Sequence, residues 1–213
     1  MYDYFLFDLD GTIVDSGLGI TNSVMYSLKK WNIDEPDRKK LYRFVGPPLY
    51  ESYEKFYGFS KEDARKAVDV YREYYSEKGV LEYELYEGIS DVLRQLKARG
   101  KTVILATSKP EIFAKKILNH SKLLPLFDFI AGATLDGSLI NKEDVIAFAL
   151  SNFPNFKPEK AIMIGDRMHD IEGAIKNNLD SIGVLYGYGD KKELTDAKAT
   201  YIVEKAKDIL KFA

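Results

Sequence analysis

The sequence contains no cysteine, which excludes several kinds of chemistry at once. The chain can form no disulfide bond, bind no cysteine-ligated zinc or iron–sulfur cluster, and use no thiolate as a nucleophile. A metal site in this chain must be built mainly from oxygen ligands, because only two histidines are present. The composition suits a reducing compartment, and we expect a cytoplasmic protein.

An excess of positive charge is also lacking. The chain has 31 lysines and arginines against 33 aspartates and glutamates, which leaves a formal net charge of −2. Proteins that bind nucleic acids by their backbone need a basic surface to neutralise phosphates. We therefore expect no nucleic-acid polymer among the partners, and an anionic ligand would have to be bound by a few locally placed cations.

Long apolar runs are missing as well. No stretch approaches the roughly 18 apolar residues that a membrane-spanning helix needs. Near the start of the chain, Asp3, Asp8 and Asp10 interrupt what would have to be the apolar segment of a signal peptide. We therefore expect no membrane partner and no export. For the oligomeric state, the expectation is a monomer or a small homo-oligomer.

Short apolar runs are present, and segments with helical spacing separate them. This alternation is typical of a parallel sheet whose strands are buried on both faces. Right-handed crossovers between such units give a doubly wound α/β fold, with ligands beyond the carboxyl ends of the strands. The predicted strands are residues 4–9, 102–106, 129–132, 161–165 and 181–186.

One long segment breaks the alternation. Between residues 16 and 82 no buried strand is evident, and the apolar residues follow helical spacing. The predicted helices there are residues 20–31, 37–44, 49–57 and 60–78. We therefore predict a catalytic α/β core formed by residues 1–15 and 83–213, with an all-helical domain, residues 16–82, inserted after the first strand.

Polar residues follow three of the predicted strands. The first strand ends in residues 8–12, Asp-Leu-Asp-Gly-Thr, the second in Thr107-Ser108, and the fourth in Asp166, with Asp170 one helical turn later. If the first strand lies between the other two, these side chains meet in one crevice. Several carboxylates in one crevice repel each other unless a cation lies among them, and oxygen ligands suit a hard ion. The sequence therefore predicts a Mg²⁺ site.

These segments resemble the motifs of the haloacid dehalogenase superfamily of aspartate-nucleophile phosphohydrolases. FDLDGTIVDS is similar to its first motif, ILATSK to its second, Lys142 to its third, and MIGDRMHDIEGA to its fourth, in the same order. The helical insertion resembles the small cap of one subgroup. FVGPPLYES and SIGVLYGYG are similar to the branch of phosphoglycolate phosphatases and 5′-nucleotidases. The resemblance implies a Rossmann-like core and the hydrolysis of a phosphomonoester.

The resemblance also implies roles for the acidic residues. Asp8 would be the nucleophile that forms an aspartyl phosphate, and Asp10 would serve as the general acid and then as the general base. Mg²⁺ would be held by the Asp8 carboxylate, the backbone carbonyl of Asp10 and Asp166, and Asp170 would orient a water on the metal.

The resemblance further implies how the substrate is bound. Thr107 and Lys142 would hold the transferring phosphoryl group. The substrate would be a small phosphorylated metabolite, such as phosphoglycolate or a nucleoside 5′-monophosphate. The other expected substrate contacts are Gly11, Thr12 and Ser108 in the core, and Arg43 and Gly46 in the insertion.

Two alternatives use the same residues. A phosphosugar mutase would keep the phosphoenzyme long enough to return the phosphoryl group to a sugar. A receiver-like switch module also combines a phosphorylated aspartate with Mg²⁺ on a doubly wound sheet, but a large helical cover gives a signalling surface no advantage. The role of His169, one of the two histidines, stays open.

Overall fold

The computed structural model describes all 213 residues, and the chain divides into two compact units. One unit comprises Met1–Asp15 and Leu85–Ala213, and we call it the α/β unit. The other comprises Ser16–Glu84, and we call it the helical unit. Its second boundary lies two residues beyond the expected residue 82.

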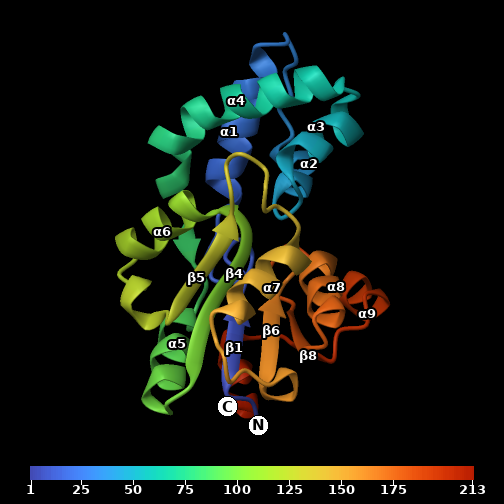
Figure 1. Cartoon of the computed structure of the whole chain (residues 1–213). Helices are drawn as coiled ribbons and strands as arrows, with labels where there is room; N and C mark the ends of the chain where they lie inside the picture. Colours follow the sequence, from blue (N-terminus) through green and yellow to red (C-terminus); the bar gives the residue numbers. More distant parts are fainter. The chain divides into compact units, whose positions relative to one another are not determined.

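The α/β unit contains a six-stranded sheet with the order β5-β4-β1-β6-β7-β8 (Figure 1). Every neighbouring pair in it is parallel. Its strands are β1 (Tyr4–Phe7), β4 (Thr102–Pro110), β5 (Phe129–Ala133), β6 (Ala161–Gly165), β7 (Asp180–Val184) and β8 (Tyr201–Val203). The predicted doubly wound parallel α/β fold is confirmed.

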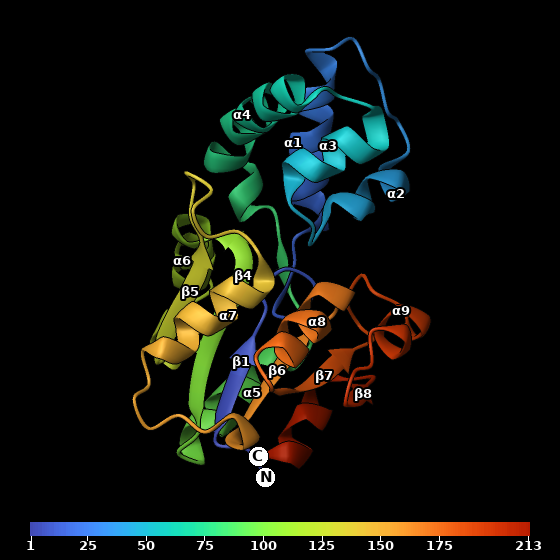
Figure 2. The same cartoon turned by 45° about the vertical axis from the view of Figure 1, so that its right-hand side comes forward.

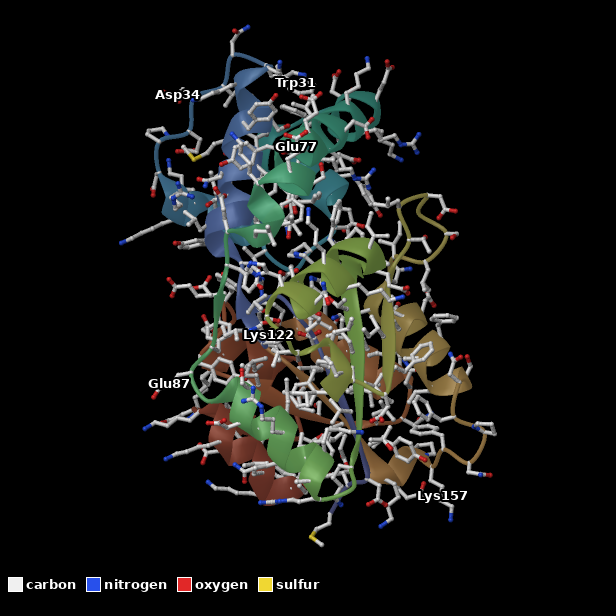
Figure 3. The ribbon with its side chains drawn as sticks, turned by 90° about the vertical axis from the view of Figure 1, so that its left-hand side faces the viewer. Trp31, Asp34, Glu77, Glu87, Lys122 and Lys157 are labelled. Carbon is white, nitrogen blue, oxygen red and sulfur yellow. The ribbon has the colours of Figure 1, made fainter.

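Strand β1 lies at the centre of this sheet. Phe7, its last residue, is paired with Leu105 of β4 on one side and with Ile164 of β6 on the other. The chain order of the strands reverses at β1, so β1, β4 and β6 end beside one another, where ligands bind in open α/β sheets. Lys157, labelled in Figure 3, precedes β6 and lies at the opposite end of the sheet.

Helices cover both faces of the sheet. Helices α7 and α8 lie on one face and α5 on the other (Figure 2). The larger apolar residues of α5 repeat at intervals of three and four, and all of them are buried, which explains its packing against the sheet: Ile89, Val92, Leu93 and Leu96. The helices are α5 (Ile89–Ala98), α6 (Glu111–His120), α7 (Lys142–Ser151), α8 (Met168–Lys176) and α9 (Lys191–Asp196).

The helical unit has its own core. Its helices are α1 (Gly17–Lys29), α2 (Arg38–Leu41), α3 (Leu49–Tyr57) and α4 (Lys61–Glu77). Ser60 begins α4 by accepting a hydrogen bond from the Asp63 N–H at 3.1 Å, as its capping pattern predicts. Aromatic rings pack on one another around the buried Tyr53: its ring stacks on that of the half-buried Phe59, with the ring centres 5.6 Å apart. The ring centre of Trp31, labelled in Figure 3, lies 5.2 Å from that of Phe59. No helix of either unit is both long and apolar enough to span a membrane.

The structure corrects several strand boundaries. β1 ends at Phe7, before the expected residue 9, because the Leu9 carbonyl accepts the N–H groups of residues 12–14 in a tight turn. β4 continues to Pro110 instead of residue 106. β8, at the edge of the sheet, has only three residues and was not predicted. Nor was the small two-stranded sheet of β2 (Val14–Asp15) and β3 (Glu84–Leu85).

Candidate active site

Three carboxylates meet at the carboxyl ends of β1 and β6. Asp8 follows β1, Asp166 follows β6, and Asp170 lies in the first turn of α8. Each can offer one oxygen within 4.8 Å of the others, and all three side chains are buried. They are far apart in the sequence and come together because β1 and β6 are neighbours. We call these residues the carboxylate trio.

Lys142 contacts two members of the trio. Its Nζ lies 2.7 Å from Asp8 Oδ1 and 2.9 Å from Asp170 Oδ1, and it donates a hydrogen bond to the Ala106 carbonyl at 3.1 Å. Burial alone would lower the pKa of the Lys142 ammonium, but the two carboxylates outweigh this effect and raise it. Lys142 is therefore a buried cation held by Asp8 and Asp170.

Burial shifts the pKa values of two carboxyl groups of the trio. Desolvation raises the pKa of Asp8, and Lys142 opposes this shift only in part. Desolvation and the neighbouring Asp170 raise the pKa of Asp166 well above its ordinary value. The protein therefore holds more negative charge here than its own cations stabilise.

The carboxylate of Asp10 points to a different partner. Both of its oxygens lie 2.8 Å from Nζ of Lys109, and both side chains are buried. Asp10 is not a member of the trio, so its expected contribution to a metal site is limited to its backbone carbonyl. We did not predict Lys109 as a site residue. The available signal was its position two residues after Thr107 in the second motif.

Thr107 and Ser108 lie near the end of β4. The Thr107 side chain is almost completely buried, and its hydroxyl accepts the Lys109 N–H at 3.2 Å. Burial raises the pKa of Asp8, and a hydrogen bond from Thr107 opposes a small part of that rise. Ser108 is half-buried. The structure thus brings Thr107 to the nucleophile candidate, as its position at the strand end predicts.

A loop after β7 packs directly on Asp166. The Tyr188 N–H donates to Asp166 Oδ2 at 2.7 Å, and the Thr12 hydroxyl lies 3.5 Å from Asp166 Oδ1. A Cβ on Gly187 would lie 2.4 Å from Asp166 Cβ, and a Cβ on Gly11 would lie 2.1 Å from Asp166 Oδ2. Gly187 and Tyr188 were not predicted as site residues, although paired glycines after a strand are a signal for a close backbone approach.

The expected site residues of the helical unit have contacts of their own. The guanidinium of Arg43 lies 4.1 Å from the ring centre of Phe56, a cation–π geometry. Gly46 has a left-handed backbone with φ of 102°. Because both belong to the helical unit, their contact with a substrate stays a prediction. His169 is half-buried and precedes Asp170 in the first turn of α8.

The residues present fit a divalent cation. The trio and Asp10 supply four buried carboxylates, and Lys142 and Lys109 supply two buried ammonium groups. The remaining negative charge matches one doubly charged ion. The donors are all oxygens, which favours Mg²⁺ over softer metals.

Comparisons with known proteins agree with this geometry. The family model described as haloacid dehalogenase-like hydrolase matches residues 5–184. A protein of Pseudomonas aeruginosa named 5′-nucleotidase is 42% identical over 200 residues, 94% of this chain and 90% of that protein. Tyrosine-protein kinase PtkA of Mycobacterium tuberculosis is 37% identical over 204 residues, 96% of this chain and 69% of that protein.

A solved structure extends the match to three dimensions. The crystal structure of a protein from Clostridium acetobutylicum, described as a predicted phosphatase, superposes with a TM-score of 0.95 at 50% identity and covers 99% of both chains. A family model that spans most of the chain, together with relatives that match nearly its whole length, leaves one assignment. The chain belongs to the haloacid dehalogenase-like hydrolase family.

Proposed function

We propose that this phosphatase is a Mg²⁺-dependent phosphomonoesterase that works through an aspartyl phosphate on Asp8. The observation that carries the proposal is the Asp8 carboxylate, buried at the end of the central strand and held 2.7 Å from the Lys142 ammonium. A nucleophile that attacks an anionic substrate must meet two conditions: it must be held in a fixed orientation, and a positive charge must lie beside it to attract the substrate. Asp8 meets both conditions.

The trio and the Asp10 backbone would hold the metal. Asp8, Asp166 and the Asp10 carbonyl would be its protein ligands, with Asp170 beside them. When bound, Mg²⁺ supplies positive charge that offsets the repulsion between the Asp8 carboxylate and the substrate phosphate.

The reaction has two half-reactions. First, a carboxylate oxygen of Asp8 bonds to phosphorus, the ester bond breaks, and the leaving oxygen takes a proton from Asp10. Water, giving a proton to Asp10, then bonds to phosphorus while the bond between phosphorus and the Asp8 oxygen breaks, so phosphate leaves and the Asp8 carboxylate is restored. Thr107 and Lys142 would stabilise the charge on the phosphoryl oxygens.

The substrate is a small phosphorylated metabolite. The Pseudomonas relative named 5′-nucleotidase favours a nucleoside 5′-monophosphate as the first candidate. Phosphoglycolate is the second candidate, supported by a relative named phosphoglycolate phosphatase 1 at 28% identity. The helical unit would serve as the cap that selects between them, with Arg43 and Gly46 as its candidate contacts.

A phosphate-release screen tests the proposal. The purified protein is assayed with Mg²⁺ against nucleoside monophosphates, phosphoglycolate and phosphosugars, beside its Asp8→Asn variant. An amide cannot attack phosphorus, so we expect Asp8→Asn to lose activity by at least about a thousandfold. Asp3→Asn is the matched control, because Asp3 precedes the same strand and pairs with Lys101.

The outcomes distinguish the alternatives. Asp8→Asn activity within tenfold of wild type would contradict the nucleophile assignment. Phosphoryl groups that appear on an acceptor sugar instead of as free phosphate would indicate the mutase. Release of no phosphate from any ester, with a stable phosphoenzyme, would indicate a switch module.

A further inference from the structure

We propose that Lys109 is a positioning residue, which fixes the Asp10 carboxylate in the orientation needed for proton transfer. The inference rests on the proposed function, because it concerns the group that would protonate the leaving oxygen and activate water. Lys109 belongs to none of the roles assigned above. Its side chain contacts Asp10 from the neighbouring strand β4.

The ion pair has the geometry of a rigid support. Lys109 Nζ lies 2.8 Å from Oδ1 and 2.8 Å from Oδ2 of Asp10. The Lys109 and Asp10 side chains are only 5% and 10% exposed. Contact with both oxygens restricts rotation of the carboxylate about its Cβ–Cγ bond. Surface ion pairs lack this restriction, because solvent competes for both partners.

An irregularity in β4 presents the Lys109 side chain to Asp10. Thr107 pairs with Gly132 of β5, but the next paired residues are Pro110 and Ala133. Two residues of β4, Ser108 and Lys109, therefore have no partner in the β5 ladder, and this irregularity is a bulge. Bulges re-aim side chains beside active sites. Without this bulge, continued pairing would place Lys109 in the regular ladder of the sheet.

Neighbouring residues hold the bulge in place. The Lys109 N–H donates to the Thr107 hydroxyl at 3.2 Å. On the other side, a Cβ on Gly132 would lie 2.8 Å from the Lys109 carbonyl oxygen and 2.6 Å from Glu111 Cα. Because both neighbours are backbone atoms, a side chain at position 132 would displace the segment that carries Lys109. Lys109 is thus held by contacts of its backbone as well as of its ammonium.

The chemistry explains why such a support is useful. Asp10 would act twice in one turnover on oxygens at different positions, first the leaving oxygen and then the attacking water. Proton transfer requires the carboxyl within hydrogen-bond reach of each oxygen. Misplacement of a reacting group by about 1 Å can cost a hundredfold in rate. A fixed ammonium on β4 keeps the Asp10 carboxyl close to one place through both steps.

The alternative role for Lys109 is direct binding of the substrate phosphate. A binding residue and a positioning residue differ in their dependence on Asp10. Loss of a positioning residue lowers kcat with little change in KM, and its effect vanishes once Asp10 can no longer transfer protons. Loss of a binding residue raises KM whatever occupies position 10.

A double-mutant cycle tests the proposal. Wild type, Lys109→Met, Asp10→Asn and the double variant are assayed with an alkyl phosphate and with p-nitrophenyl phosphate. We expect Lys109→Met to lower kcat for the alkyl phosphate by about tenfold to a hundredfold. The first nitrophenol turnover should fall by much less, because nitrophenolate leaves without a proton. In the Asp10→Asn background, Lys109→Met should change the rate of the first nitrophenol turnover by less than about threefold.

Two further variants complete the design. Lys109→Arg should retain much of the activity, because a guanidinium also holds both oxygens of a carboxylate. Lys101→Met is the matched control: Lys101 precedes β4 at its other end and pairs with Asp3 at 3.1 Å, so its loss should leave both substrates unaffected. Thermal unfolding of each variant shows whether it folds. If Lys109→Met does not, Gly132→Ala displaces the bulge and should give the same dependence on leaving group.

Each contrary result has a definite meaning. A raised KM, with the same loss in the Asp10→Asn background, would assign Lys109 to substrate binding and overturn the positioning role. A first nitrophenol turnover that falls as much as the turnover of the alkyl phosphate would overturn it too. An active wild type with an unaffected Lys109→Met variant would overturn the Lys109 role alone. A wild type that releases no phosphate from any ester would overturn the proposed function, and the Lys109 role with it.

Discussion

The Nζ atom of Lys142 lies 2.7 Å from Oδ1 of Asp8, and their side chains are only 4% and 8% exposed. The same ammonium contacts Asp170 at 2.9 Å, so one lysine separates two carboxylates of the trio. Removing either partner of a buried ion pair leaves a charge that neither water nor protein stabilises. Lys142 therefore supports the folded state as well as the proposed reaction.

We expect Lys142→Met to lower both activity and stability. The loss of a positive group near the transferring phosphoryl should reduce kcat by about a hundredfold to a thousandfold. Breaking the buried pair should cost about 3–5 kcal/mol of unfolding free energy without divalent cations. Mg²⁺ should restore part of this stability, because it supplies positive charge to the same carboxylates.

Thermal unfolding with and without Mg²⁺ checks this prediction. The matched control is Lys176→Met, because Lys176 pairs with Glu143 at 2.6 Å but is 58% exposed. Exposed pairs contribute at most about 1 kcal/mol. Equal destabilisation by the two substitutions would show that Lys142 does not compensate the trio.

The raised pKa values of Asp8 and Asp166 predict how stability depends on pH without divalent cations. Between the ordinary value of 3.8 and the raised folded values, these carboxyls keep protons that the unfolded chain has released. The folded state then binds more protons, so their contribution to the unfolding free energy falls as pH rises through this window. Asp166→Asn should remove part of that fall.

Urea unfolding in EDTA at a series of pH values measures this effect. The difference between wild type and Asp166→Asn isolates the carboxyl from exposed acids such as Asp136, whose lowered pKa acts in the opposite direction. Relative to wild type, the variant should become more stable as pH rises. Parallel curves for the two proteins would contradict the burial of a costly charge at Asp166.

The sheet was predictable because its signals are local. Buried strands appear as short apolar runs, and acids directly after them, such as Asp8 and Asp166, mark the carboxyl edge. Only the position of β1 between β4 and β6 had to be assumed, and the structure supplies it. The three residues of β8 carry too short a pattern to be recognised, since an edge strand needs little apolar sequence.

The parts that could not be predicted depend on non-local geometry. The contact of Lys109 with Asp10 depends on a bulge in β4 where it pairs with β5. The sequence of β4 contains no pattern that predicts this bulge. The contact of Gly187 with Asp166 depends on how the chain leaves β7. Regular strands can be predicted from the periodic placement of apolar residues in the sequence. Contacts made at bulges and tight loops cannot, because the backbone departs there from the regular pattern.

Gly187→Ala tests the close packing around Asp166. The new Cβ would lie 2.3 Å from the Gly11 carbonyl oxygen and 2.4 Å from Asp166 Cβ, so the loop must shift. We expect kcat to fall at least tenfold and stability to fall by about 1–3 kcal/mol. Steady-state kinetics and thermal unfolding measure the two effects.

Gly58→Ala is the matched control for this substitution. Gly58 has φ of +68°, and a Cβ added there would meet no atom within 4 Å, so alanine introduces backbone strain alone. It should cost about 1–2 kcal/mol of stability and leave kcat unchanged. If Gly187→Ala lowers stability but spares kcat as Gly58→Ala does, the loop does not position Asp166 for activity.

The leaving group separates the proposed role of Asp10 from that of Asp8. Asp10→Asn is the suitable substitution, because its amide oxygen can still accept a hydrogen bond from Lys109 while it cannot transfer a proton. An alkoxide needs that proton to leave, whereas p-nitrophenolate leaves without it. The first half-reaction should therefore survive with the aryl ester and fail with an alkyl phosphate.

The second half-reaction should fail with both substrates, because water still needs a base to attack the aspartyl phosphate. With p-nitrophenyl phosphate, Asp10→Asn should release about one equivalent of nitrophenol in a burst and then stall. Intact mass of the quenched protein should show one added phosphoryl group, and Asp8→Asn should show neither burst nor added mass. Rapid mixing with both substrates measures this, and steady turnover of either one by Asp10→Asn would remove Asp10 from proton transfer.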